Sequence, residues 1–344
     1  MITTAWFIIL SAMLTMYAVL DGFDLGVGAL HLWVGKTDDE RGRAIGAIGP
    51  VWNGNEVWLI AAGGAMVVAF PHLYASAFSG FYLALMLVLW LLILRGIGIE
   101  LRHQIDHPLW RQAWDVVFCG ASALLAMLFG VALSNVMRGV PFDASGEFQG
   151  SFALLLNPFA LLGGVVALLL LMLHGAAYLA MKTDGAMHAR AWRAVGVLSI
   201  VAPLGVILIF AASFFVRPDF FLNFQRWPLL WAAPILAVSA IVFLRRTWRR
   251  PPDARRERQV FTASAALIVG LLASVFGGMY PTLLPSLDPS VHPGLDITNA
   301  AGPRHSLRIA LGIYLFGMTV VSLYLVRIYR VWRGKVPSGA AYHP

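Results

Sequence analysis

The sequence has little charge. Only 12% of its 344 residues are Asp, Glu, Lys or Arg, whereas soluble domains carry about 25%. Hydrophobic residues make up 59% of the chain, and its mean hydropathy is +0.76. This composition excludes an ordinary soluble domain and predicts a protein that crosses a membrane several times. Because the strand alternation of a membrane barrel is also absent, the spans are expected to be helices.

Cysteine is nearly absent, since Cys119 is the only one in the sequence. A single cysteine excludes an intrachain disulfide and any Cys-ligated zinc or iron–sulfur site within this chain. No basic segment precedes the first apolar run and no small-residue cleavage site follows it. We therefore expect that run to be a retained helix and not a signal peptide.

In place of charge, the sequence has apolar runs of about 20 residues or more, the length that crosses roughly 30 Å of hydrocarbon as a helix. We predict an all-α, polytopic membrane protein with a single membrane domain over residues 1–344. A faint similarity between residues 19–26 and 172–179 would fit two four-helix bundles plus one further helix, although chance similarity between apolar helices is the simpler explanation. The nine predicted transmembrane helices cover residues 5–33, 51–70, 74–101, 113–136, 156–181, 191–216, 227–245, 259–281 and 304–332.

Basic residues concentrate in alternate connections. Of the 25 Lys and Arg residues, 19 lie in the first, third, fifth and seventh connections and at the C-terminal end, five lie on the opposite side, and Arg95 lies within a helix. The positive-inside rule then predicts a cytoplasmic C-terminus and an outside N-terminus. The net charge of +8 is therefore largely a topology signal and does not indicate nucleic-acid binding. The seventh connection, with seven arginines between residues 245 and 258, is also expected to meet anionic membrane lipid.

Ionisable residues inside the apolar runs are few. Asp21 and Asp24 lie three residues apart in the first predicted helix and so share a face. An acid deep in lipid costs roughly 2.5–3.5 kcal/mol, which indicates that it is kept for a partner, a water-filled path or a proton. Asn53 and Glu56 share a face at the start of the second predicted helix, and Arg95 lies in the inner half of the third. All are expected at similar depth in the cytoplasmic half.

This set of residues allows two interpretations. The acids and Arg95 could form a buried ion-pair cluster that holds the helices together, or they could form part of a proton path from the cytoplasm. Three acids against one base leave surplus carboxylate, which favours proton handling. A proton-coupled transporter is an alternative, but it should show paired broken helices, and Gly63–Gly64 and Gly277–Gly278 do not occupy corresponding places.

Histidine is the residue that would indicate a haem in the membrane. His174, in the fifth predicted helix, is the best buried candidate among nine histidines. No two in-membrane histidines have the facing arrangement of a bis-histidine haem, and a single one is more often a helix contact than a ligand. The sequence therefore predicts no metal or haem ligated by this chain.

Several motifs in order along nearly the whole chain resemble the second subunit of cytochrome bd quinol oxidases. They are LDGFDLGVG at 20–28, GPVWNGNEVWLIAAGG at 49–64, FPHLYASAFSGFY at 70–82, Arg95, WD at 114–115 and LLNPFALLGG at 155–164. The resemblance implies two four-helix bundles plus a peripheral helix. It also implies a bacterial cytoplasmic membrane and a larger partner, subunit I, that holds two haems b and one haem d. Such a complex oxidises quinol and reduces oxygen to water.

In this family, subunit II is the haem-free part of the quinol:oxygen oxidoreductase. It is thought to contribute to the proton path, and in some members it binds a structural quinone. Which quinone is used, and whether a small single-helix accessory subunit is present, stay open. A subunit that serves only as a scaffold is the remaining alternative.

The sequence departs from the family pattern at Asn53, where well-known members have an acid assigned to proton uptake. An amide cannot exchange protons as a carboxylate does. Glu56 stands one turn further on the same face, where some members have glutamine. Our hypothesis is that the acidic function has moved to Glu56, or that Asp21 and Asp24 suffice with bound water.

Overall fold

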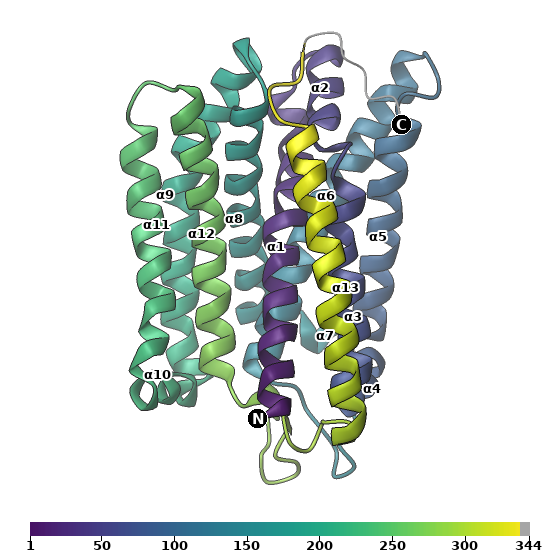
Figure 1. Ribbon diagram of the computed structural model, residues 1–344, viewed down its shortest axis with the longest axis vertical. Coiled ribbons are helices and arrows are strands. Elements are labelled where there is room, and N and C mark those ends of the chain that lie inside the picture. The colour runs from purple at the N-terminus through teal and green to yellow at the C-terminus, as the bar shows by residue number, and fades with distance from the viewer. Residues whose placement is uncertain (338–344) are drawn as a thin grey trace.

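The computed structural model describes residues 1–337, which form long helices standing side by side (Figure 1). The long helices are α1 (Ile2–Val34), α3 (Trp52–Ala69), α5 (Tyr82–Leu101), α6 (Pro108–Arg138), α8 (Pro158–Lys182), α9 (Gly185–Val216), α11 (Ala232–Trp248), α12 (Ala254–Met279) and α13 (Arg304–Val331). The short elements are α2 (Asp38–Ile48), α4 (Pro71–Gly80), α7 (Phe152–Leu155), η1 (Pro218–Phe221), α10 (Leu222–Arg226), η2 (Pro228–Trp231), and the antiparallel strands β1 (Thr282–Leu284) and β2 (Leu295–Asp296).

Eight helices among the described residues are long and apolar enough to cross a membrane. This confirms the predicted all-α, polytopic fold. Helix α3 is not among the eight, because Asn53, Asn55 and Glu56 in its first turns lower its mean hydropathy. The count of nine spans and the division into two bundles stay predictions.

Two local features differ from the expected helix boundaries. The run predicted as one helix over 74–101 is divided at Phe81, which leaves α-helical geometry with φ −94° and ψ 17° and separates α4 from α5. The structure has a further helix, α2, in the segment that was predicted to be the first connection. Hydropathy did not indicate this helix, because the charged residues of its first turn offset its buried apolar residues. Thr37 and Glu40 form a capping box at its start, and this T-x-x-E spacing is the signal that predicts such a helix.

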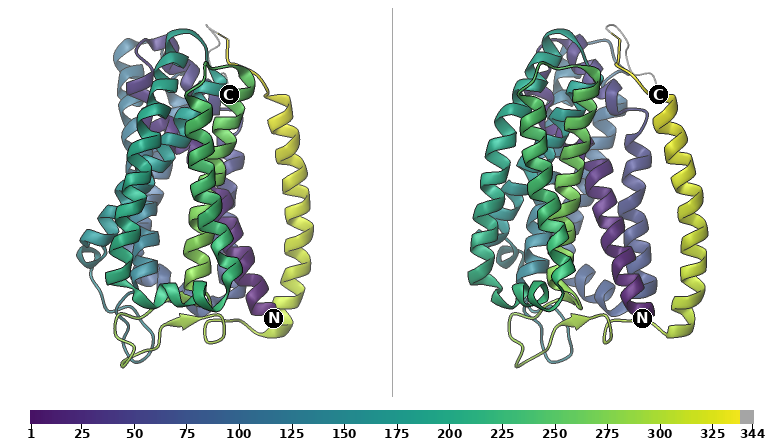
Figure 2. Two further views of the ribbon diagram at one scale, coloured as in Figure 1. Left: turned by 90° about the vertical axis from the view of Figure 1, so that its left-hand side faces the viewer. Right: turned by 60° about the vertical axis from the view of Figure 1, so that its left-hand side comes forward.

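The two ends of the molecule differ in character. One end, drawn at the top in Figure 1, carries α2 and the last turns of α13, and we call it the basic end because the Lys- and Arg-rich connections lie there. The opposite end carries the N-terminus, α4, α10 and the loops around β1 and β2 (Figure 1). Helix α13 runs along the edge of the bundle in both views of Figure 2 and contacts chiefly α1 and α3.

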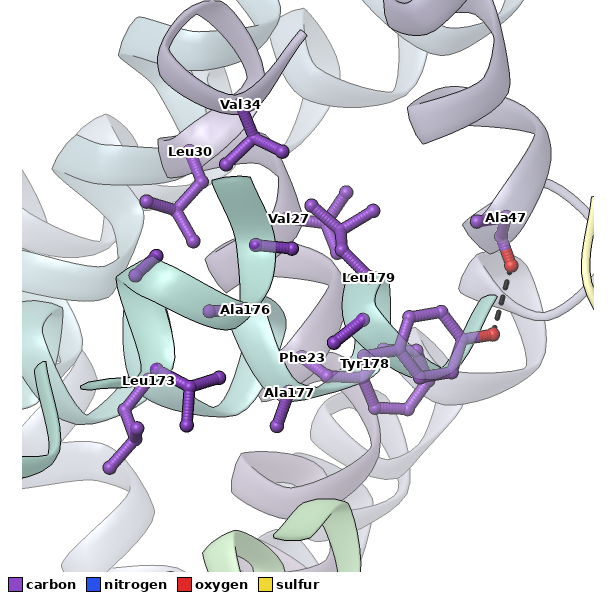
Figure 3. Packing of buried hydrophobic residues seen from close by; sticks show 14 of the residues in the cluster. Phe23, Val27, Leu30, Val34, Ala47, Leu173, Ala176, Ala177, Tyr178 and Leu179 are labelled. Carbon is purple, nitrogen blue, oxygen red and sulfur yellow. Dashed lines mark hydrogen bonds between the residues drawn. The ribbon is translucent and has the colours of Figure 1, made fainter. Parts of the chain in front are cut away.

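Helix α1 is central, since it contacts α3, α6, α8 and α12. Its Phe23 ring stacks on Tyr178 of α8 at a centroid distance of 4.1 Å, and the Tyr178 hydroxyl donates to the Ala47 carbonyl oxygen of α2 at 2.9 Å (Figure 3). At Gly26 the backbones of α1 and α8 touch, as small residues allow between membrane helices. A Cβ atom at Gly26 would lie 1.9 Å from the Leu171 carbonyl oxygen.

This close approach makes Gly26 sensitive to substitution. We expect Gly26→Ala to destabilise the protein by about 1–3 kcal/mol, because the added methyl group meets backbone that cannot move aside. The midpoint of thermal unfolding of the purified protein measures the effect. Gly120→Ala is the matched control, because nothing lies within 4 Å of a Cβ there. An equal fall in both variants would contradict the explanation.

Candidate functional site

Arg95 and Asp21 form a buried ion pair between α5 and α1. Arg95 donates through Nη1 to Asp21 Oδ2 at 2.8 Å and through Nη2 to Oδ1 at 2.5 Å. Their exposed fractions are 1% and 0%. The two parallel hydrogen bonds fix the orientation of both groups. The pair as a whole is neutral, which is how two charges can be placed in a membrane-spanning bundle.

Asp24, one turn along α1 from Asp21, has a different environment. Its Oδ2 atom accepts a hydrogen bond of 2.8 Å from Asn55 Nδ2 of α3. The other end of the Asn55 amide accepts from the hydroxyl of Tyr329 in α13, also at 2.8 Å. Asp24 is fully buried, and its Oδ1 atom has no hydrogen-bond partner within residues 1–337. A carboxyl oxygen with unused bonding capacity can bind a water molecule or accept a proton.

The structure places the two predicted site residues of α3, Asn53 and Glu56, nearer the surface than Asp21 and Asp24. Asn53 is exposed and Glu56 is partly exposed on α3. Among the described residues, neither has a hydrogen bond or ion pair with Asp21 or Asp24. It is Asn55, not Asn53, that contacts Asp24 of α1.

Asn55 and Tyr329 are therefore the site residues that the sequence reasoning missed. Asn55 belongs to a buried stripe of α3 with Trp52 and Trp58, three residues away on either side. That spacing indicates the face that packs inward, and it could have identified Asn55. For Tyr329 we find no local signal, because the contact joins residues 274 positions apart.

A second polar cluster lies at the basic end. Asp115 of α6 is 1% exposed and its Oδ1 atom lies 2.6 Å from His31 Nε2 of α1 and 2.6 Å from Arg102 Nε. Arg102 also donates to Asp38 Oδ1 of α2 at 2.6 Å. The cluster therefore joins α1, α2 and α6 where the connection between α5 and α6 begins.

Unsatisfied polar atoms lie along the face of α1 from Asp24 to His31. They are buried and have no hydrogen-bond partner among residues 1–337: His31 Nδ1 and Asp24 Oδ1 on α1, and Ser122 Oγ on α6. Ser122 lies opposite Gly28, where a Cβ atom would be 2.0 Å from its Oγ. Buried polar atoms in proteins are normally satisfied by protein or by ordered water. This face of α1 thus offers a succession of groups able to bind water.

His174, the candidate for a haem ligand, is hydrogen-bonded through both ring nitrogens. Nδ1 lies 2.7 Å from Ser264 Oγ, and Nε2 lies 3.0 Å from the Val19 carbonyl oxygen. Its ring stacks on Phe261 at 4.8 Å. Neither nitrogen is available to a metal in this arrangement. Within residues 1–337, no group of three or more His, Cys, Asp or Glu side chains is placed to hold a metal ion.

Comparisons of sequence and comparisons of fold relate this chain to the same kind of protein. The family model described as cytochrome bd terminal oxidase subunit II matches residues 2–332. A probable cytochrome oxidase subunit 2 of Haemophilus influenzae is 36% identical over 95% of this chain and 92% of its own length. Cytochrome bd-I ubiquinol oxidase subunit 2 of Escherichia coli K12 is 32% identical over 96% of this chain and 94% of its own length. The structure of bd oxidase from Geobacillus thermodenitrificans has a similar fold, with a TM-score of 0.79 at 15% identity over 96% of this chain and 98% of that one.

Proposed function

Because the chain belongs to the cytochrome bd terminal oxidase subunit II family, we propose that it pairs with a haem-bearing subunit I and supplies part of the path by which protons reach the oxygen-reducing site. The family and the apolar helices make it a multi-pass bacterial membrane protein and a subunit of a quinol-oxidising oxidoreductase complex. In the proposed complex, two haems b and one haem d in subunit I supply the redox chemistry, while this chain holds and transfers protons.

The observation that carries the proposal is the contrast between Asp21 and Asp24. The charge of Asp21 is neutralised by Arg95, which donates a hydrogen bond to each of its carboxylate oxygens. The proposed role of Asp21 is therefore to hold α1 against α5. Asp24 has one amide partner and one unused, buried oxygen. Of the two acids, Asp24 is thus the one with capacity for a proton. It is the proposed proton carrier within α1.

The route to Asp24 is proposed to begin at the basic end. The His31–Asp115–Arg102 cluster lies there, and Ser122 lies between that cluster and Asp24 along α1. Water bound along this face would link the groups by hydrogen bonds. The route requires the basic end to face the cytoplasm, which is the orientation that the arginine distribution predicts.

Subunit I is proposed to cover the face formed by α3, α5 and α13. Only 6% of the residues in the membrane-crossing window of α13 are buried, against 56% in α8. The polar side chains of Asn53 and Glu56 also lie exposed or partly exposed on α3, where contact with lipid would be costly. A protein partner on this face would shield them and would bring Glu56 to the boundary between the subunits.

Glu56→Gln tests whether Glu56 takes part in the proton path. We expect oxygen reduction by the purified complex to slow about fivefold, equivalent to about 1 kcal/mol of barrier, because the amide keeps the shape but cannot exchange protons. Haem content and assembly with subunit I should not change. Oxygen consumption and proton uptake are the measurements.

Glu147→Gln is the control, since Glu147 is an exposed acid in the loop at the opposite end. Full turnover and full proton uptake in Glu56→Gln would contradict a role for Glu56 and leave the proposed Asp24 route to be tested alone. A purely structural subunit would show no selective effect on proton uptake in any of these variants.

A further inference from the structure

A groove of about 540 Å³ lies between α11 and α12 on the outer surface of the bundle. Its walls are mostly apolar, with Leu236 and Phe243 from α11 and Ala266 from α12. Arg255 and Arg258, in the first turns of α12, line the same groove. No Asp or Glu is among its lining residues.

Charge and apolar surface are arranged along the groove in the order of a phospholipid. Arg258 is near the basic end, and Ala266 lies eight residues further along α12, about 12 Å deeper. On α11, Phe243 and Leu236 follow the same direction away from the basic end. The groove is therefore cationic where lipid headgroups lie and apolar where acyl chains lie.

The two arginines have no ion pair among the described residues. The neighbouring Arg256 is paired with Asp253 at 2.9 Å. The Asp253 carboxylate also accepts hydrogen bonds from the backbone N–H groups of Arg255 and Arg256, as the cap of α12. The guanidinium groups of Arg255 and Arg258 thus remain available for an anion from outside the chain, and guanidinium binds phosphate oxygens through paired hydrogen bonds.

We propose that this groove binds one anionic phospholipid, with its phosphate on Arg255 and Arg258 and an acyl chain along α11 and α12. Basic pockets between transmembrane helices on the cytoplasmic side are a known form of headgroup recognition. Helix α11 lies at the opposite side of the molecule from α5 (Figure 1). The groove therefore stays open to lipid when a partner covers α3, α5 and α13, and the proposal does not depend on the proton path.

The chain offers a matched control for general attraction of lipid to basic surface. Arg249 and Arg250 lie in the same connection but do not line the groove. The test compares Arg255→Ala/Arg258→Ala with Arg249→Ala/Arg250→Ala in the purified, delipidated complex. Native mass spectrometry would count bound phosphatidylglycerol, phosphatidylcholine and inorganic phosphate as each is added.

We expect one phosphatidylglycerol to bind the unchanged complex, and to bind about 30-fold more weakly when both groove arginines are removed. Phosphatidylglycerol should bind the Arg249→Ala/Arg250→Ala complex as it binds the unchanged one. Ser239→Leu, at an exposed lining position, should weaken lipid binding by filling the acyl part of the groove. Unchanged haem content and unfolding midpoint would show that the variants are folded.

Three results would overturn the proposal. Equal weakening in the two arginine pairs would show only a general basic surface. Equal binding of phosphatidylcholine would remove the preference for an anionic headgroup. Inorganic phosphate that binds as tightly as the lipid would show a simple anion site with no part for the acyl groove.

Discussion

Replacing Arg95 by methionine is expected to destabilise the complex by about 3–5 kcal/mol, because it leaves the Asp21 carboxylate buried without its counter-charge. Asp21 is fully buried and both of its oxygens accept from Arg95. Methionine has a similar apolar length, so the loss of packing is small and the loss of charge dominates. The unfolding midpoint and the yield of assembled complex are the measurements.

The double variant Arg95→Met/Asp21→Asn separates charge from packing. With both charges removed, most of the lost stability should return, since neutral replacement of a buried pair is far less costly than breaking it. Arg95→Lys keeps the charge but not both hydrogen bonds, so its stability should lie between those of Arg95→Met and the double variant. If the double variant is as unstable as Arg95→Met, the ion pair is not what stabilises this part of the bundle.

Asp24→Asn is expected to lower the rate of oxygen reduction at least about tenfold, a barrier change of about 1.4 kcal/mol. The amide oxygen can still accept the hydrogen bond from Asn55, so the fold should be kept, but the group no longer takes up and releases a proton. Proton uptake during single-turnover oxidation of the reduced complex should slow in parallel. Binding of oxygen to the haems should not change.

Asp106→Asn is the control for this variant. Asp106 is an exposed acid at the basic end, paired only with Arg111 among the interactions found in the described residues. Asp106→Asn changes the net charge by the same amount as Asp24→Asn, but it leaves α1 unchanged. Normal turnover in Asp24→Asn would contradict the proposed route and favour a scaffold role, whereas slow turnover with normal proton uptake would place the defect elsewhere.

The parts of the site that could be predicted are those set by depth in the membrane. Asp21 and Arg95 carry opposite charge on two helices that both run toward the basic end, and counting residues from the helix ends places them at one level. The same count places Asp24 at a similar depth. The sequence also indicated the helix that supplies the amide, because polar residues cluster at the start of α3.

Rotation of a helix about its own axis was harder to predict. The spacing of Asn53 and Glu56 suggested that this pair faces inward, yet Asn55 does so. Neighbouring bulky residues decide the rotation, since Trp52 and Trp58 are buried on the same side as Asn55. The division at Phe81 was missed because the apolar run continues through it, and hydropathy alone carries no signal for a change of direction.

The family resemblance indicated a candidate site on the first three predicted helices but left its chemistry open. An acid expected at position 53 is an amide here, and that amide is exposed on α3 and is not hydrogen-bonded to Asp24. If Glu56 has taken over the acidic role, it does so from the boundary with subunit I and not from inside this chain. The Glu56→Gln and Asp24→Asn variants together distinguish a relay through both residues from a path through Asp24 alone.

The hydrogen bond from Tyr329 to Asn55 has a consequence for the order in which the protein is made. By occupying the amide oxygen, Tyr329 turns the amide nitrogen of Asn55 toward Asp24. Tyr329 lies near the end of α13, which is synthesised after every other described helix. The surroundings of Asp24 therefore remain incomplete throughout synthesis of the preceding helices. A chain that stops before α13 would contain both aspartates and Arg95, but it would lack the group that fixes the Asn55 amide.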